Sequence, residues 1–448
     1  MNARPSKTRP LRLAAAFAAC VLAVLALVDL RAERRFAPPR ITERAAAAGA
    51  LRAGAGRAPF ELPADVALAG YRLFGRSPRD GATPLHARSL LVEAGGVRTA
   101  LVLVELMTLP PELAEAIRRR AAAAGAACTL VVASHTHSGP GGYDRSFLPQ
   151  LALGRYRQEV EGAILAAVES SLAAARADLG PALLALGEGE AAGLASNRDH
   201  KGAAVDARLT LAALGRPDGR RIATLARFSA HPTLNPKAVG PAGDWPGFVM
   251  ERLDEGGGVS FILPGAVGDA RPTRAASPGV GRVRALTFAE SVLEALGGIE
   301  LEPAQAEVPL GCASVAFDLP AADLRGMVPP GLGRLVSNLA DPAAPREAAA
   351  IAWRLGELAL IGVPAEPLAA GAPVLEQVAE EAGLRGRVVG LAQGYVSYLV
   401  GEAEMEKRAP SARNAWFGEA LAPRVEEAAR AATRALELRP AIGERIAD

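Results

Sequence analysis

Short runs of apolar and β-branched residues, which are typical of buried strands, are spread along the chain. A second pattern, in which apolar residues recur every three or four positions, is typical of helices that bury one face. Val160, Ile164, Val168 and Leu172 have this spacing and predict a helix within residues 154–176. Buried strands are predicted at residues 99–106, 128–132, 259–263, 357–363 and 387–391. Further helices are predicted at residues 111–124, 367–382 and 423–438.

The order of these elements predicts an α/β fold. The helix at residues 111–124 lies between two predicted strands and forms with them a βαβ unit, which builds a parallel sheet. Residues 208–214 and 220–228 flank a Pro-Asp-Gly turn and predict an antiparallel hairpin. No long flexible linker divides residues 60–440. We therefore expect a single large domain with a mixed sheet core flanked by helices.

Residues 1–35 have the pattern of an export signal. Basic residues precede an uncharged apolar run at residues 13–28, which is short for a membrane span of roughly 20 residues. A cleaved signal peptide and an uncleaved signal-anchor both fit, while the apolar residues that follow Cys20 argue against a lipoprotein signal. We expect an exported protein that is periplasmic, extracellular or anchored to the membrane. Residues 36–59, rich in alanine, arginine and proline, are predicted to form a linker.

The composition is that of a globular protein, because charged residues make up 22% and hydrophobic residues 50% of the chain. The net charge is +2 with both signs interspersed, so no nucleic-acid-binding surface is expected. Beyond the N-terminal segment the sequence contains Cys128 and Cys312. They can form one disulfide, but Cys128 lies in a predicted core strand and we interpret it as a small buried hydrophobe. The pattern does not predict an oligomeric state.

The predicted strand at residues 128–132 leads directly into the sequence HTHSGPGG at residues 135–142. Ligands of α/β proteins gather where strands end. If the backbone stays extended through His137, then His135 and His137 point to the same side. One could then bind a metal while the other acts as acid or base beside it. For this pair alone, two exposed loop histidines are the simpler interpretation.

Several other segments with chemically useful side chains follow predicted strands or lie in polar loops, and each in isolation is an ordinary turn or strand end. They are Asn197-Arg198, His231-Pro-Thr with the downstream Asp244, the turn with Asp269 and Arg271, Glu366, and the pair Tyr395 and Tyr398.

In their order and flanks, these segments resemble the neutral (non-lysosomal) ceramidase family, zinc-dependent amidohydrolases that cleave ceramide into sphingosine and a fatty acid. HTHSGPGG is identical to the family motif, and Asn197-Arg198 matches its Asn-Arg element. His231-Pro-Thr and residues 243–247 match its His-Pro-Thr and Ser/Gly-Asp-x-x-Gly elements. Pro-Ala-Glu366 corresponds to Pro-Gly-Glu, and residues 390–398 correspond to Gly-Leu-x-Asn-x-Tyr-x-x-Tyr with glutamine in place of asparagine. The likeness covers the family's N-terminal catalytic domain, and no C-terminal immunoglobulin-like domain is expected.

The resemblance implies a zinc site. The family's zinc ligands correspond to His135, His231, Glu366 and Tyr398. Two imidazoles, a carboxylate and a phenol suit a catalytic zinc ion, because they provide nitrogen and oxygen ligands and leave room for a water.

The resemblance also implies roles around the metal. His137 corresponds to an active-site histidine that can move protons, and Arg198 to an arginine that holds the scissile carbonyl oxygen. Asp269 is expected to belong to the catalytic group. Tyr395 and Asp244 are expected to contact the substrate.

Two departures from the family bear on activity. The nucleophilic serine of Gly-Asp-x-Ser-Pro corresponds to Arg271, and the tyrosine that partners the arginine corresponds to Pro410. Without the serine, we expect water activated at the metal to attack the amide, with His137 returning the proton to the leaving amine. Arg271 would bind an anionic group of the substrate or assist Arg198. A one-residue misalignment that leaves another hydroxyl in the serine's place is a further interpretation.

Two functions remain open. The first is a zinc-dependent amidohydrolase that acts on an N-acyl sphingoid or related N-acyl lipid. Because such substrates are lipids, a membrane surface is also a candidate partner. The second is a non-catalytic relative that keeps zinc and binds a lipid or a partner protein. Loss of the nucleophile favours the second, because such a loss usually costs many orders of magnitude in rate.

Overall fold

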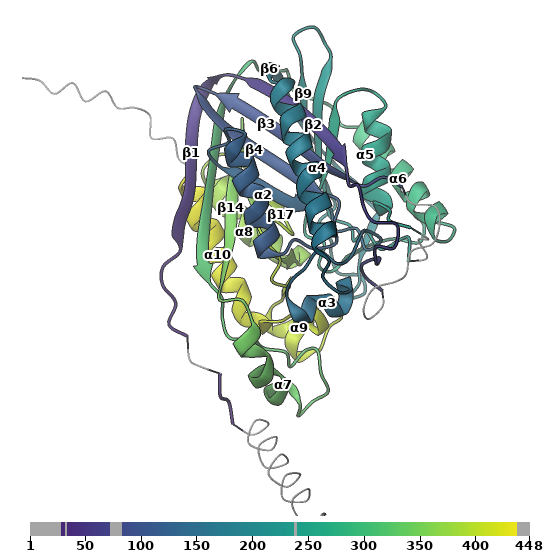
Figure 1. The fold of residues 1–448 in the computed structure, drawn as a ribbon, viewed down its shortest axis with the longest axis vertical. Coiled ribbons are helices and arrows are strands. Elements are labelled where there is room, and N and C mark those ends of the chain that lie inside the picture. Colours follow the sequence, from purple (N-terminus) through teal and green to yellow (C-terminus); the bar gives the residue numbers. More distant parts are fainter. Residues whose placement is uncertain (1–27, 32–33, 72–82, 237–239, 437–448) are drawn as a thin grey trace, which may run out of the picture.

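A computed structural model describes residues 28–31, 34–71, 83–236 and 240–436. Most of the predicted export segment, residues 1–27 and 32–33, lies outside these ranges. The described strands form two five-stranded sheets, a four-stranded sheet and two strand pairs. Helices cover the outer faces of the sheets (Figure 1). The single mixed α/β domain predicted from the sequence is confirmed.

The first five-stranded sheet contains the predicted βαβ unit. Its order is β5-β4-β3-β2-β6, and β4 and β5 are parallel. Helices α2 and α4 lie across its outer face (Figure 1). A Cβ at Gly54 or Gly56 of β2 would collide with the α4 backbone at Ala175 or Ser171, so these glycines allow the helix to approach the sheet. The bounds are β2 (Arg52–Pro59), β3 (His86–Ala94), β4 (Val97–Val104), α2 (Pro111–Ala123), β5 (Thr129–Ala133), α4 (Gln158–Ala177) and β6 (Gly180–Pro181).

The second five-stranded sheet has the order β1-β13-β14-β15-β17, and α8 and α10 pack on it. Its β15 and β17 are parallel and flank α8, in agreement with the predicted strand–helix–strand order. The bounds are β1 (Arg40–Ala50), β13 (Glu307–Asp318), β14 (Glu347–Leu355), β15 (Leu358–Gly362), α8 (Ala372–Glu381), β17 (Arg385–Val389) and α10 (Leu421–Arg434).

The prediction of a linker at residues 36–59 is wrong for residues 40–59. These residues form β1, which pairs antiparallel with β13, and β2, which pairs with β3. Alanine and glycine carry too little side chain to show the alternation by which a strand is recognised. Both strands are held by partners far along the chain, so the local sequence does not reveal them.

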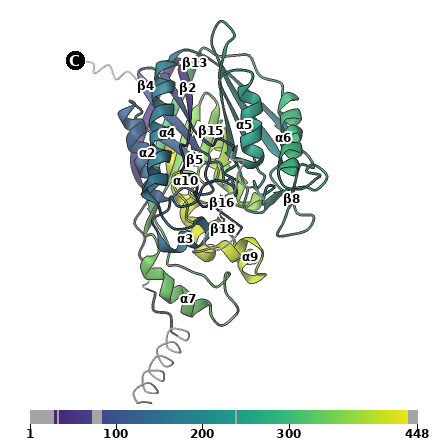
Figure 2. The ribbon, with the colours of Figure 1, turned by 45° about the vertical axis from the view of Figure 1, so that its right-hand side comes forward.

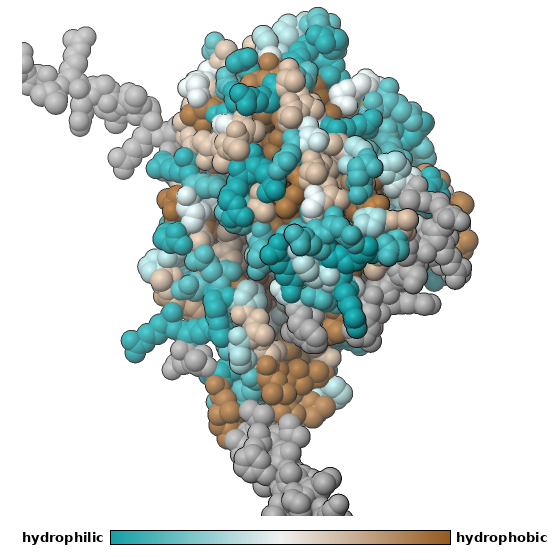
Figure 3. Space-filling view, viewed as in Figure 1, coloured by the Kyte–Doolittle hydropathy of each residue, from teal (hydrophilic) through white to brown (hydrophobic). Residues whose placement is uncertain are grey.

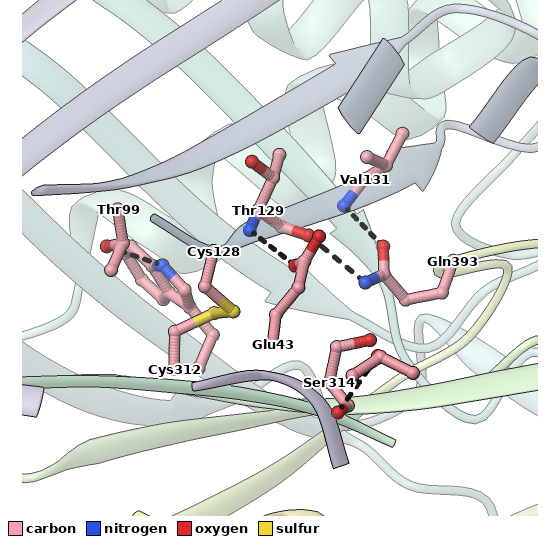
Figure 4. Close-up of a disulfide and its surroundings, with 10 residues drawn as sticks. Glu43, Thr99, Cys128, Thr129, Val131, Cys312, Ser314 and Gln393 are labelled. Atoms are coloured by element: carbon pink, nitrogen blue, oxygen red, sulfur yellow. Dashed lines mark hydrogen bonds between the residues drawn. A yellow bond between two sulfur atoms is a disulfide. The ribbon is translucent and has the colours of Figure 1, made fainter. Parts of the chain in front are cut away.

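A disulfide joins the two five-stranded sheets, which corrects the interpretation of Cys128 as a buried free thiol. Cys128, just before β5, is bonded to Cys312 in β13 (Figure 4). The indole Nε1 of Trp353 on β14 donates a hydrogen bond of 3.0 Å to Thr99 Oγ1 on β4 in the same interface. The cysteines are 184 positions apart, and stacking of the sheets brings them together.

The four-stranded sheet has the order β11-β10-β9-β7 and contains the predicted hairpin, β9 with β10. Helices α5 and α6 lie beside it (Figure 2). Two strand pairs, β8 with β12 and β16 with β18, form separate two-stranded sheets. The bounds are β7 (Leu183–Glu190), β8 (Ala195–Asn197), β9 (Arg208–Gly215), β10 (Arg221–Phe228), α5 (Asp244–Asp254), β11 (Val259–Pro264), β12 (Ala270–Pro272), α6 (Arg282–Gly297), β16 (Glu366–Pro367) and β18 (Tyr398–Leu399).

Short helices complete the described chain: α3 (Phe147–Leu153), α7 (Gly333–Ala340) and α9 (Glu402–Glu406), with 3-10 turns η1 (Asp341–Ala343), η2 (Ala369–Gly371), η3 (Ser411–Asn414) and η4 (Gly418–Ala420). Within the described ranges, no helix has both the length and the apolar character needed to cross a bilayer.

Candidate metal centre and active site

His135 and His137 lie just beyond the end of β5. His135 has a φ of 68°, so the backbone does not stay extended from β5 through His137. The turn nevertheless brings the rings together, because the Nε2 atoms of His135 and His137 are 3.4 Å apart. His135 is buried and His137 is half-buried. The histidines therefore face a common point and are not two exposed loop residues.

His231 joins them from the end of β10. Its Nε2 is 3.0 Å from Nε2 of His135. The ligand atoms of these two residues and His137 all lie within 4.8 Å of one another. Glu366 Oε2 is 3.2 Å from His135 Nε2 and 3.6 Å from His231 Nε2. Three of the four predicted metal ligands thus meet at one point.

The fourth predicted ligand, Tyr398, is held beside Glu366 by the β16–β18 pair, in which these two residues are direct partners. Burial, and then the Glu366 carboxylate, raise the pKa of Tyr398 well above its usual value. Arg198 Nη2 donates to the Tyr398 hydroxyl at 2.9 Å. The phenol therefore lies between the carboxylate and the guanidinium group.

The hydrogen bonds of the two buried histidines fix the direction of their lone pairs. Nδ1 of His135 is 2.8 Å from the Met107 carbonyl oxygen, and Nδ1 of His231 is 3.0 Å from that of Val267. A carbonyl can only accept, so each Nδ1 carries a proton, and in the neutral ring each Nε2 is then a bare acceptor. Burial, and then the charge of Arg198, lower the pKa of His231 well below its usual value, which keeps this ring neutral.

This arrangement fits a bound cation. Two bare nitrogens facing each other cannot hydrogen-bond, and Glu366 Oε2 is buried without a hydrogen-bond partner among the described residues. Two nitrogens bound to one tetrahedral zinc ion at about 2.05 Å would be about 3.3 Å apart, close to the observed separation. The contacts of Nδ1 with backbone carbonyls are those that commonly orient metal-binding histidines. His135 and His231 could therefore bind a metal together with Glu366, and His137 belongs to the same group of side chains.

Tyr395 and Glu366 form a supporting contact. The Tyr395 hydroxyl donates to Glu366 Oε1 at 2.8 Å, so the two carboxylate oxygens have different environments. Burial, and then the negative charge of Glu366, raise the pKa of Tyr395 well above its usual value and keep the phenol protonated. This contact orients Oε2 toward the histidines. The role predicted for Tyr395 in substrate contact stays a prediction.

Arg198 lies at the edge of the cluster. Its backbone N–H donates to the Asp269 carbonyl oxygen at 2.8 Å, and its Nη2 donates to the Gly268 carbonyl oxygen at 2.6 Å. Its Nε is buried without a partner in the described part of the chain. A rigid guanidinium group with an unused donor beside the metal-binding side chains can hold a substrate oxygen.

Asp269, predicted to belong to the catalytic group, and Asp244, predicted to contact the substrate, are both buried. The Asp269 carboxylate accepts from Asn197 Nδ2 at 2.7 Å and from the Ala369 backbone N–H at 2.9 Å. The Asp244 carboxylate accepts from the backbone N–H groups of Leu234, Asn235 and Trp245, and Asp244 is fully buried. Asp244 therefore fixes the loop after His231, and its predicted contact with substrate is not supported by its position.

Arg271, the residue in place of the family serine, is exposed on β12, while Ala270 and Pro272 on either side are buried. Alternation along a strand directs Arg271 away from the side on which its neighbours pack. Its guanidinium group makes no hydrogen bond or ion pair with the described part of the chain. This position does not support an oxyanion role.

The groups that orient the metal-binding side chains and the end of β5 were not predicted from the sequence. These are the carbonyl oxygens of Met107 and Val267 and the side chain of Gln393. Gln393 donates to the Thr129 carbonyl and accepts from the Val131 N–H, both at 3.1 Å, and so covers the edge of β5 (Figure 4). The glutamine in the tyrosine motif was the one available signal. A surface groove of about 600 Å³ lies between α2 and α4, and no residue of the candidate metal centre lines it.

The comparisons with known proteins agree with this geometry. Residues 54–233 match the family described as neutral/alkaline non-lysosomal ceramidase, N-terminal, which agrees with the resemblance found in the sequence.

One curated relative and two solved structures show how far the similarity extends. The neutral ceramidase of Mycobacterium tuberculosis is 30% identical over 155 residues, which are 32% of this chain and 24% of that protein. The match thus spans about a quarter of that relative's length. Neutral ceramidase from Pseudomonas aeruginosa has a similar structure, with a TM-score of 0.72 and 21% identity over 87% of this chain and 75% of that one. A ceramidase complexed with C2 gives a TM-score of 0.67 and 20% identity over 86% and 75%. At these identities the structural likeness establishes the fold.

Proposed function

We propose that the protein is a zinc-dependent amidohydrolase that cleaves the amide bond of an N-acyl sphingoid or related N-acyl lipid. The observation that supports this most directly is the convergence of two bare imidazole nitrogens and an unpartnered carboxylate oxygen. His135, His231 and Glu366 supply these atoms from the ends of three different segments. The family match supports the reaction class.

His135, His231 and Glu366 would hold the zinc ion, with the Tyr398 hydroxyl next to them. When bound, zinc polarises a carbonyl and lowers the pKa of a coordinated water toward about 7. The protein's contribution is to fix these ligands through the Met107 and Val267 carbonyls, which set the tautomers.

The remaining groups handle the substrate. The Nε–H of Arg198, which has no hydrogen-bond partner among the described residues, would donate to the carbonyl oxygen, where negative charge develops during attack. The half-buried ring of His137 is placed to take a proton and return it to the leaving amine, because its Nε2 lies 3.4 Å from His135 Nε2. No side-chain nucleophile is required in this scheme, which suits the exposed arginine at position 271.

We also propose that the protein is exported. The disulfide between Cys128 and Cys312 supports this, because such bonds persist in oxidising compartments. The pattern of residues 1–35 supports the same conclusion.

The second candidate is a non-catalytic relative that keeps the metal and binds a lipid. The observation that favours it is the exposed Arg271 in place of the family serine, together with the exposed Pro410 in place of the family tyrosine. The two candidates share the metal site and differ in turnover.

The test is to purify the protein, measure bound zinc, and assay fatty-acid release from ceramide and from simpler N-acyl amides. We expect one equivalent of zinc and hydrolysis that is lost in His135→Ala. His200→Ala, a histidine outside the metal-binding group, serves as the matched control for zinc content. Hydrolysis that survives in His135→Ala would contradict the proposal. Zinc binding without hydrolysis across the acyl panel would support the binding relative instead.

A further inference from the structure

The end of the molecule around α7 exposes a group of large apolar side chains. Met327, Leu332 and Leu339 are 44%, 45% and 58% exposed, and Val28 and Leu30 are 46% and 56% exposed beside them. We call these five residues the apolar tip. Figure 3 shows hydrophobic surface gathered at the lower end of the molecule, where α7 lies in the same view of Figure 1. Clustered exposure of this kind marks an interaction site, whereas single exposed apolar residues do not.

The second half of α7 departs from the burial pattern of a water-facing helix, although Arg334 is exposed and Leu335 and Val336 are half-buried as usual. Ser337 and Asn338 are turned inward, where Ser337 Oγ accepts from the Leu324 N–H at 2.9 Å. Leu332, just before the helix, and Leu339, near its end, face outward. A helix on a water-exposed surface normally buries its apolar side and exposes its polar side. The surroundings of this end of the molecule are therefore expected to be apolar.

The N-terminal segment reaches the protein at the same place. The Asn338 side chain donates to the Val28 carbonyl oxygen at 2.8 Å and accepts from the Leu30 N–H at 3.0 Å. Val28 is the last residue of the uncharged apolar run at residues 13–28. The residues that directly follow the apolar run therefore contact the domain beside the apolar tip.

The apolar tip is also connected to the active-site segment. Arg408 donates to the carbonyl oxygens of Arg325 and Val328 in the loop before α7. Arg408 lies between β18, which carries Tyr398, and η3. In both ribbon views α7 lies at the end of the molecule near α3 and α9 (Figures 1 and 2).

We propose that the apolar tip inserts into the interfacial region of a lipid bilayer. A bilayer is the occupant that explains both the outward leucines and the apolar sequence that ends at Val28. A second copy of the chain or a soluble protein would explain the leucines alone. The apolar tip contains none of the metal-binding residues. Its proposed role, membrane contact, is therefore separate from the proposed hydrolysis.

The first test measures binding of the full chain to vesicles of phosphatidylcholine and phosphatidylglycerol by sedimentation. We expect the double variant Leu332→Asp/Leu339→Asp to lower the partition coefficient about tenfold or more, because two apolar side chains no longer leave water. The matched control is Val280→Asp/Val283→Asp near the start of α6, where the valines are 80% and 60% exposed. This control should bind as the unaltered protein does. Equal binding of all three proteins would overturn the proposal, since residues outside the tip would then suffice.

The second test locates the tip in the bilayer. Tryptophan introduced as Leu339→Trp should gain quenching by brominated phosphatidylcholine that Val283→Trp does not show. Equal quenching in the two variants would overturn the proposal. Self-association without vesicles that is lost in the aspartate double variant would assign the tip to a second copy and also overturn it. Hydrolysis of a soluble short-chain N-acyl amide should be unchanged by the tip substitutions, so a failure here is distinguishable from a failure of the proposed enzyme activity.

Discussion

The Nε2 atoms of His135 and His231 face each other at 3.0 Å, and the opposite nitrogen of each ring contacts a backbone carbonyl oxygen. When both rings are neutral, neither Nε2 has a proton to share, so the two lone pairs repel each other unless a cation lies between them. The carboxylate of Glu366, 3.2 Å from His135, adds negative charge at the same point. This relationship makes metal binding the main physical expectation of the structure.

The contact between Tyr395 and Glu366 predicts a defect in metal affinity. Tyr395→Phe removes the 2.8 Å hydrogen bond to Oε1 but keeps the ring that packs against Trp416. We expect zinc affinity to fall about 10- to 100-fold, because partners of metal ligands typically contribute this much. Competition with a zinc chelator measures the affinity. Tyr156→Phe, in which a half-buried tyrosine on another part of the surface loses its hydroxyl, should leave it unchanged. Unaltered affinity in Tyr395→Phe would refute a positioning role.

Arg198 and Arg271 are predicted to differ in their effect on turnover. Arg198→Lys removes the Nε donor and should lower kcat about 100- to 1000-fold while zinc content stays the same. Arg271→Lys should change kcat by less than about threefold, because the exposed guanidinium group makes no hydrogen bond or ion pair with the described residues of the site. Steady-state kinetics with a soluble N-acyl amide separate the two. A large loss in Arg271→Lys would restore the oxyanion role that the sequence suggested.

The disulfide predicts a loss of stability on reduction. The double variant Cys128→Ala/Cys312→Ala should unfold about 2 to 5 kcal/mol more easily than the oxidised protein, because the bond closes a loop of 184 residues in the unfolded chain. Urea unfolding with and without dithiothreitol measures this difference. The unaltered protein should respond to the reductant and the variant should not. A response to reductant in both proteins would show that another bond is responsible.

Asp144 predicts a decrease in stability with rising pH. Burial raises its pKa to about 6 in the folded protein, against roughly 3.9 in an unfolded chain. Below about pH 4 the carboxyl is protonated in both states and costs nothing. Between these pKa values the folded state holds the proton more tightly, so the free energy of unfolding falls as the pH rises, by up to about 3 kcal/mol above pH 6.

Asp144→Asn removes this titration while keeping the shape of the side chain. We expect the variant to be more stable than the unaltered protein at pH 8 and equally stable near pH 4, as measured by urea unfolding. Asp65→Asn, at an exposed aspartate, should change stability by less than about 0.5 kcal/mol at either pH. A constant difference between Asp144→Asn and the unaltered protein across this pH range would be inconsistent with the raised pKa.

Strong local patterns explain the parts of the fold that the sequence predicted well. The apolar run of β5, the helix spacing of α4 and the turn between β9 and β10 are local features, and each element formed where its pattern lies. β1 and β2 were missed because alanine and glycine give no alternation and long-range pairing stabilises both strands. The disulfide was missed for a related reason, since the stacking of two sheets joins Cys128 to Cys312.

The candidate site shows the same division. The order of the motifs identified His135, His231 and Glu366 as metal ligands, because the type of each residue and its place in a motif are visible in the sequence. The functions of Asp244 and Arg271 depend on where the side chains point, which a motif does not specify. The carbonyl oxygens of Met107 and Val267 belong to the backbone and have no sequence signature at all.

The most direct measurement is an anomalous difference map collected at the zinc absorption edge from crystals of the purified protein. We predict one strong peak within bonding distance of His135 Nε2, His231 Nε2 and Glu366 Oε2. A fully ordered site without such a peak after zinc loading, or a peak bound by other residues, would contradict the proposed metal centre.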